Sequence, residues 1–67
     1  MFRVEVIFIN AHPSSPWAQV GTLCRSYHTA SELFEAFVKN THAKGIRILD
    51  IARDPILQDQ VIISVER

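Results

Sequence analysis

The sequence predicts a two-layer α+β domain in which one helix packs on a four-stranded, mostly antiparallel sheet, in the order strand, strand, helix, strand, strand. Three observations predict this fold class. Residues 2–9 begin as an alternation of apolar and charged side chains, residues 30–41 repeat apolar side chains at helical spacing, and residues 46–52 and 61–66 are rich in Ile and Val. We expect residues 1–67 to form a single compact domain, near the size at which one hydrophobic core is only marginally sufficient.

The helix is predicted from both of its ends. Thr29 and Glu32 have the spacing of a capping box, so the helix is expected to begin at Thr29. Gly45 is expected to end it, and three basic residues in the segment 39–44 precede that glycine, where positive charge favours the carbonyl end of a helix. The apolar stripe expected to face the sheet consists of Ala30, Leu33, Phe34, Phe37 and Thr41.

The first half of the chain is predicted to contain two strands. Residues 2–9 form the first strand, and residues 10–16 form a loop because their two prolines lack an amide donor and disfavour helix. The second strand is expected from Trp17 to about Tyr27. Gly21 within it indicates a bulge or a close approach of another part of the backbone.

The second half is predicted to contain the other two strands. Residues 46–52 form the third strand, residues 53–60 turn around an Asp-Pro pair, and residues 61–66 form the fourth strand. The right-handed crossover rule favours the strand order 2-1-3-4, with the second and third strands parallel and the first between them. The predicted core consists of Phe2, Val4, Val6, Phe8, Leu33, Phe34, Phe37, Ile48, Ile63 and Val65.

One helix covers only one face of such a sheet, yet apolar residues also occur in the opposite phase of the strands. They are Ile7, Ile9, Leu49, Ile51 and Ile62. A large exposed apolar surface usually marks an interface, and a formal net charge of zero supplies no repulsion between copies. We therefore expect self-association as a homodimer.

Composition excludes several classes of protein. A hydrophobic fraction of 48% argues against disorder, and one cysteine allows no internal disulfide, which favours the reducing cytoplasm. The first residues lack the features of a signal peptide, and no apolar run approaches the roughly 20 residues that span a bilayer. We expect a cytoplasmic protein that does not act in a membrane.

The residues with reactive side chains do not form a recognised motif. Cys24 and His28 are spaced to share one face of a strand, and with His12 or His42 they would suggest zinc or a thiolate-imidazole pair. A structural zinc site needs four ligands in tight local pairs, which this sequence lacks. A lone cysteine in a strand is more often a small buried apolar residue. We expect no metal, no cofactor and no enzymatic activity.

The sequence therefore favours a small protein-protein interaction module that acts as an adaptor or inhibitor through an exposed sheet face or edge. Its size is that of small accessory proteins of phages and mobile elements. Trp17 follows a loop containing proline and serine, and tryptophan is enriched where interfaces are strongest. The residues expected to bind the partner protein are Trp17, Tyr27, Arg25, Ile7 and Leu49.

The alternative is a small nucleic-acid-binding regulator that uses the open sheet face. Tyr27 or Trp17 would stack on bases while Arg25, Arg47 and Arg53 contact phosphates. The zero net charge and the missing aromatic-basic motif of common RNA-binding modules disfavour it.

Overall fold

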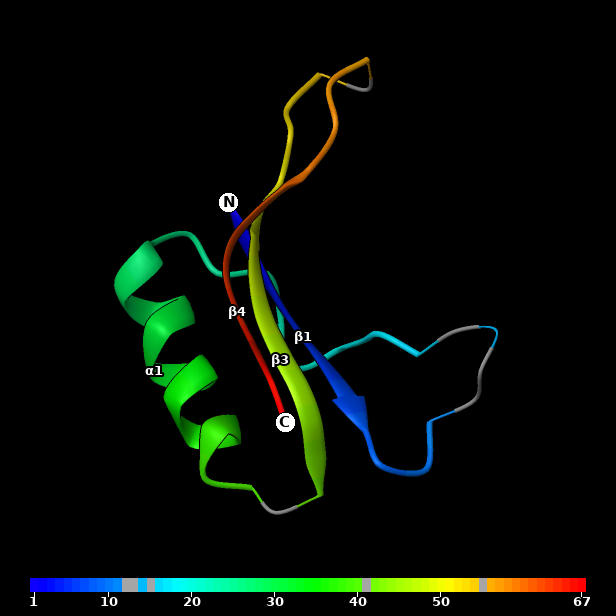
Figure 1. Cartoon of the computed structure of the whole chain (residues 1–67). Helices are drawn as coiled ribbons and strands as arrows, with labels where there is room; N and C mark the ends of the chain where they lie inside the picture. The colour runs from blue at the N-terminus through cyan, green and yellow to red at the C-terminus, as the bar shows by residue number, and fades with distance from the viewer. Residues whose placement is uncertain (12–13, 15, 41, 55) are drawn as a thin grey trace.

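The computed structural model describes residues 1–11, 14, 16–40, 42–54 and 56–67. One helix lies against one side of an open sheet, and long connections extend beyond the sheet between β1 and β2 and between β3 and β4 (Figure 1). This arrangement confirms the predicted α+β fold class. The elements are β1 (Phe2–Phe8), β2 (Ala18–Gln19), α1 (Tyr27–Val38), β3 (Ala43–Asp50) and β4 (Gln60–Glu66).

The strand order is β2-β1-β3-β4, as the crossover rule predicts. Each neighbouring pair is antiparallel, so β2 and β3 run in the same direction on either side of β1. α1 crosses one face of the sheet between them and packs on β1 and β3. The strand that lies farthest from β2 is β4, and its second edge pairs with no strand of the described sheet.

The core lies between α1 and the two central strands. Every second residue of β1 and β3 faces the helix, and the most completely buried side chains of this face are Val4, Val6, Ile46 and Ile48. Phe34 of α1 packs against them. Cys24 is buried in the same cluster, which confirms that the lone cysteine acts as a small buried apolar residue. The expected core residues that only partly reach this cluster are Phe2, Phe8, Leu33, Phe37 and Val65.

The prediction that Ile63 belongs to the core is wrong, since its side chain is 38% exposed. Ile63 is opposite Ile48 in the sheet and therefore on the face that carries the helix, but α1 packs on β1 and β3. A single helix is narrower than four strands that lie about 4.8 Å apart. The outermost strand consequently stays largely exposed.

The N-terminal end of the helix lies earlier than predicted. Ser26, in extended conformation, is the N-cap, and its Oγ accepts a hydrogen bond from the backbone amide of Thr29 at 3.2 Å. Thr29 is therefore inside the first turn rather than at the cap. The predicted capping box is wrong because serine, another strongly preferred cap residue, stands three positions before it.

Replacing Ser26 with Ala is expected to lower the free energy of unfolding by about 1 kcal/mol, because the amide of Thr29 loses its acceptor. The matched control is Thr29→Ala, which leaves that acceptor in place and is expected to have a smaller effect. Urea denaturation followed by far-ultraviolet circular dichroism measures both. A larger loss for Thr29→Ala than for Ser26→Ala would contradict the observed cap.

The C-terminal end of the helix also differs from the prediction. α1 ends at Val38, with Lys39 as the C-cap and no basic residue in the last helical turn. Gly45, predicted to stop the helix, lies inside β3, opposite Ile7 of β1. The third strand begins at Ala43, three residues earlier than expected. Thr41 of the predicted stripe lies outside the described residues.

The second strand is much shorter than the predicted one. β2 contains only Ala18 and Gln19, because Gly21 adopts a φ of +68° that ends the extended conformation. A Cβ at Gly21 would lie 3.1 Å from Cδ2 of Leu33, so the neighbour at this glycine is a side chain of α1 and not the backbone that the sequence led us to expect. After this bend Cys24 pairs with Phe2 as an isolated bridge and fixes the chain just before the helix.

Candidate functional site

The outer edge of β4 is the first candidate site. β4 pairs with β3 on one side only, and the three apolar residues near its start are exposed: Val61 is 50%, Ile62 46% and Ile63 38% accessible. Isolated exposed apolar residues are common on proteins, but three in succession on a strand with a free edge are not. Figure 1 shows β4 running along the side of the sheet from the β3–β4 connection to the end of the chain.

The hydrogen-bond pattern shows which backbone groups of β4 point outward. The amide of Arg67 donates to the carbonyl of Lys44 at 2.9 Å. Antiparallel ladders alternate hydrogen-bonded and non-hydrogen-bonded pairs, and the regular register from Glu66 to Ile63 carries this alternation along β4. The backbone groups of Ser64 and Glu66 therefore point away from β3, toward the free edge.

A register shift changes the side-chain arrangement near the start of β4. Ile63 is opposite Ile48, but Val61 is opposite Leu49, so Ile62 is an extra residue without a partner on β3. Neighbouring residues of β3 face opposite sides of the sheet, and side chains of opposite residues share a face. Simple alternation along residues 61–66 would place Val61 and Ile63 on one face. The register shift instead places them on different faces, which leaves apolar side chains on both faces of β4.

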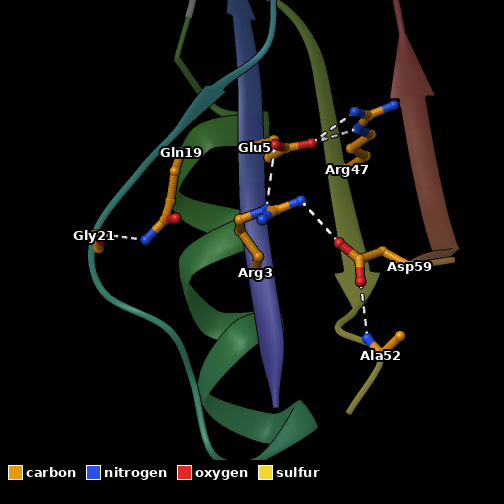
Figure 2. Close-up of polar contacts among 7 residues, drawn as sticks. All are labelled: Arg3, Glu5, Gln19, Gly21, Arg47, Ala52 and Asp59. Atoms are coloured by element: carbon orange, nitrogen blue, oxygen red, sulfur yellow. Dashed lines mark hydrogen bonds and ion pairs between the residues drawn. The ribbon is translucent and has the colours of Figure 1, made fainter. Parts of the chain in front are cut away.

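The face of the sheet opposite α1, called the open face below, carries a row of ionic contacts (Figure 2). Glu5 of β1 is 9% exposed, and its Oε1 accepts a hydrogen bond from Nε of Arg47 at 2.8 Å. Its Oε2 lies 3.2 Å from Nε of Arg3, whose Nη2 donates to Oδ2 of Asp59 at 3.2 Å. These two arginines are neutralised within the sheet.

Trp17 covers one end of this row. The Cζ atom of Arg47 lies 4.0 Å from the centroid of the indole ring, a cation-π contact. A Cβ at Gly45 would lie 3.3 Å from Cη2 of Trp17 and 3.7 Å from Cδ1 of Ile7. Trp17 is half-buried, and the absence of a side chain at Gly45 makes room for its ring.

The structure separates the five residues predicted to bind a partner into two groups. Trp17 and Ile7 lie together on the open face, and Leu49 is on the same face but only 5% exposed, between Arg3 of β1 and Val61 of β4 in register. The remaining two lie at the start of the helix. Arg25 is exposed before the N-cap, and Tyr27 packs edge-to-face on Phe2 with ring centroids 5.8 Å apart.

The sequence pattern predicted binding through an exposed sheet face or edge and placed Ile62 among the out-of-phase apolar residues, but it did not single out the edge of the fourth strand. The signal was present in the run from Val61 to Val65, where apolar side chains occupy both phases of one strand. A strand that is apolar in both phases is expected to be covered on both faces. Here α1 covers only one face and does not extend over β4, so Ile62 and Ile63 are left accessible.

The candidate chemical residues do not come together. Cys24 is buried, with its Sγ 3.6 Å from the carbonyl of Thr22, whereas His28 lies in the first turn of α1 and pairs with Glu32 at 3.0 Å. His42 is exposed in the turn before β3, and His12 lies outside the described residues. Across the described part of the chain, no group of three or more metal-ligating side chains is found.

A depression of about 330 Å³ lies at the end of the sheet near Pro16. Ile7 and Gly45 form part of its lining, together with the polar side chains of Lys44, Glu66 and Arg67. Arg67 donates from Nη1 to the carbonyl oxygen of Asn40 at 3.0 Å, so it ties the end of β4 to the segment after α1. This depression therefore holds a structural contact rather than a set of converging catalytic groups.

Comparisons of the chain with profiles of protein families, with curated proteins and with solved structures find no match. Among the described residues, no helix combines the length and apolar character needed to cross a bilayer. The function must therefore be argued from the geometry of the sheet. The two features that require an explanation are the free edge of β4 and the ionic row on the open face.

Proposed function

We propose that the chain is a non-enzymatic protein-interaction module, of the adaptor or inhibitor kind, which binds an extended polypeptide segment along the free edge of β4. The observation that carries the proposal is a combination of two properties on one strand. Backbone groups of Ser64 and Glu66 point outward, and the side chains of Val61, Ile62 and Ile63 are exposed beside them. A strand added to a sheet edge uses these same two properties.

Two terms stabilise such a complex. Each new main-chain hydrogen bond contributes a net of about 0.5 to 1.5 kcal/mol. Each square ångström of apolar surface removed from water contributes about 25 cal/mol. Covering the exposed half of Val61 and the exposed parts of Ile62 and Ile63 therefore stabilises the complex further. The backbone term supplies general affinity, and the apolar side chains select the residues of the partner strand.

The sequence of β4 lacks the features that usually protect an exposed edge. Between Gln60 and Glu66 there is no proline and no lysine, and the only charge is at Glu66. The opposite edge of the sheet is β2, which has two residues and offers little backbone for pairing. Of the two edges of the described sheet, β4 therefore suits strand addition.

The open face gives weaker support to the alternative of nucleic-acid binding. Arg47 is held by Glu5 and covered by Trp17, and Arg3 is held between Glu5 and Asp59. Phosphate contacts would have to break these pairs.

The lone cysteine is buried at Cys24, which is consistent with action in the reducing cytoplasm, and we propose that location for the complex.

The proposal is tested by immobilising the chain, exposing it to a cytoplasmic extract and comparing the proteins captured by two lysine variants. Ile63→Lys places a charge on the apolar part of the β4 edge and is expected to weaken capture by about tenfold or more. Ile56→Lys is the matched control, because Ile56 is 87% exposed in the β3–β4 connection, away from the edge. Circular dichroism verifies that both variants are folded.

Capture that depends on Ile63 but not on Ile56 supports the module. Identical captured proteins for the parent and both variants would show that β4 does not bind them. An extract that yields no specific protein, with a parent chain that also does not self-associate, would count against the proposal. A separate titration with DNA and RNA at low salt, where phosphate contacts are strongest, tests the nucleic-acid alternative.

A further inference from the structure

We propose that the strand which occupies the β4 edge is β4 of a second copy, paired antiparallel about a two-fold axis at Ser64, so that one continuous sheet crosses both copies. This inference rests on the proposed function, since it names the partner of the same edge. A two-fold arrangement lets one surface satisfy both copies, which makes it the commonest form of self-association.

The backbone of β4 matches its own copy in this register. With the axis at Ser64, each Ser64 is opposite Ser64 of the second copy, and each Glu66 is opposite Ile62 of the second copy. Ser64 and Glu66 have outward-pointing groups, and the register shift leaves Ile62 without a partner on β3. Hydrogen-bonded pairs of an antiparallel ladder need outward groups at both positions, which the central pair of Ser64 residues provides.

The side chains match as well. On the face that carries the helix, Ile63 of one copy is opposite Val65 of the other, and the pairing occurs twice because of the symmetry. Ile63 is 38% exposed and Val65 is half-buried in the single copy. Directly opposite side chains have Cβ atoms about 4.5 to 5.5 Å apart, so both would gain an apolar neighbour.

Neighbouring registers are worse. Placing the axis at Ile63 would set Val65 opposite Val61, whose side chain the register shift has turned to the other face. Placing it at Val65 would set Ile63 opposite Arg67, an apolar side chain against a charged one. The register centred on Ser64 keeps the pairing within the regular part of β4.

Charge distribution also favours an antiparallel second copy. At one end of the β3–β4 pair the cationic Lys44 and Arg67 outnumber the carboxylate of Glu66. At the other end lie the anionic Asp50 and Asp59, of which Asp59 is also paired with Arg3. Antiparallel pairing brings the basic end of one copy next to the acidic end of the other, and the symmetry repeats this at the opposite end. The formal net charge of zero leaves no general repulsion between copies.

Single cysteine variants test the register. Ser64→Cys changes one exposed side chain and is expected to give an intermolecular disulfide under mild oxidation, because hydrogen-bonded opposite residues have Cα atoms about 5.5 Å apart. Ile63→Cys alone and Val65→Cys alone are expected not to cross-link, since each meets its own counterpart only across a diagonal of about 7 to 8 Å. Mixing these two variants is expected to restore the cross-link.

The parent chain is the internal control, because its buried Cys24 is expected to give no disulfide between copies. Sedimentation equilibrium of the parent is expected to show a concentration-dependent rise to twice the 7.6 kDa mass of one chain. Ser64→Pro removes the outward amide of Ser64 without removing a β3–β4 hydrogen bond, so it is expected to remain folded and monomeric.

A parent chain that sediments at the mass of one chain at every concentration, with no disulfide in Ser64→Cys, would overturn the proposed pairing. Equal cross-linking of Ile63→Cys and Ser64→Cys, each on its own, would overturn the register. A monomeric parent whose capture of other proteins is still abolished by Ile63→Lys would overturn self-pairing and leave the proposed function intact, so the two failures can be told apart.

Discussion

Replacing Phe34 with Ala is expected to lower the free energy of unfolding by about 3 to 5 kcal/mol, which is most of the stability of a domain this small. Phe34 is 7% exposed and belongs to the cluster of buried residues between α1 and the sheet. Truncation removes the transfer free energy of the ring and leaves a cavity that Ala30 and the β-branched residues of the strands fill poorly. Urea denaturation at fixed protein concentration measures the loss.

Phe37→Ala is the matched control for this prediction. Phe37 also belongs to the apolar stripe of α1, but it is only partly buried and packs edge-to-face on Phe8 with ring centroids 6.3 Å apart. Its truncation opens toward solvent rather than into a closed cavity, so a smaller loss is expected. If Phe37→Ala were as destabilising as Phe34→Ala, the centre of the core would lie further toward the C-terminal end of the helix.

The parts of the fold that the sequence predicted well depend on local patterns. In residues 2–8 the alternation of side chains continues through a strand that has neighbours on both sides, and the observed β1 agrees with the prediction to within one residue. The strand order followed from one topological rule applied to a helix between two strands. Neither inference needed any long-range contact to be known.

The start of the helix could not be predicted from local pattern alone, because Ser26 and Thr29 are both good cap residues. Two backbone hydrogen bonds of 2.8 Å between Phe2 and Cys24 decide between them. They hold Cys24 against the sheet, and the chain then turns into the helix at Ser26. A contact between residues far apart in the sequence therefore overrides the capping box that the sequence alone suggests.

The candidate site was only partly predictable for a similar reason. The apolar run at the start of β4 is visible in the sequence, but its exposure depends on how far one helix reaches across four strands. The unpaired Ile62 depends on a register shift against β3. Trp17 was assigned to partner binding because of its loop, whereas its contact with Arg47 arises from the position of β2 beside β1.

Replacing Glu5 with Gln is expected to lower the free energy of unfolding by about 2 to 3 kcal/mol. Glu5 is the carboxylate that contacts both Arg3 and Arg47 on the open face, and both of its oxygens are engaged. The variant keeps the shape of the side chain but leaves two guanidinium groups close together without a negative charge between them. The loss of one partner from a buried ion pair costs about 3 to 5 kcal/mol, and the partial exposure of both arginines reduces it here.

Salt dependence separates this electrostatic cost from a packing cost. Chloride screens the repulsion between the side chains of Arg3 and Arg47, so the difference between Glu5→Gln and the parent is expected to shrink as sodium chloride rises from about 0.05 M to 1 M. Gln19→Ala is the control, because Gln19 is opposite Glu5 on β2 but uncharged and exposed, and its small effect should not depend on salt. Trp17 fluorescence follows both unfolding and the position of Arg47. A Glu5→Gln variant as stable as the parent at low salt would mean that the arginines find solvent without the carboxylate, and that the ionic row does not hold the open face together.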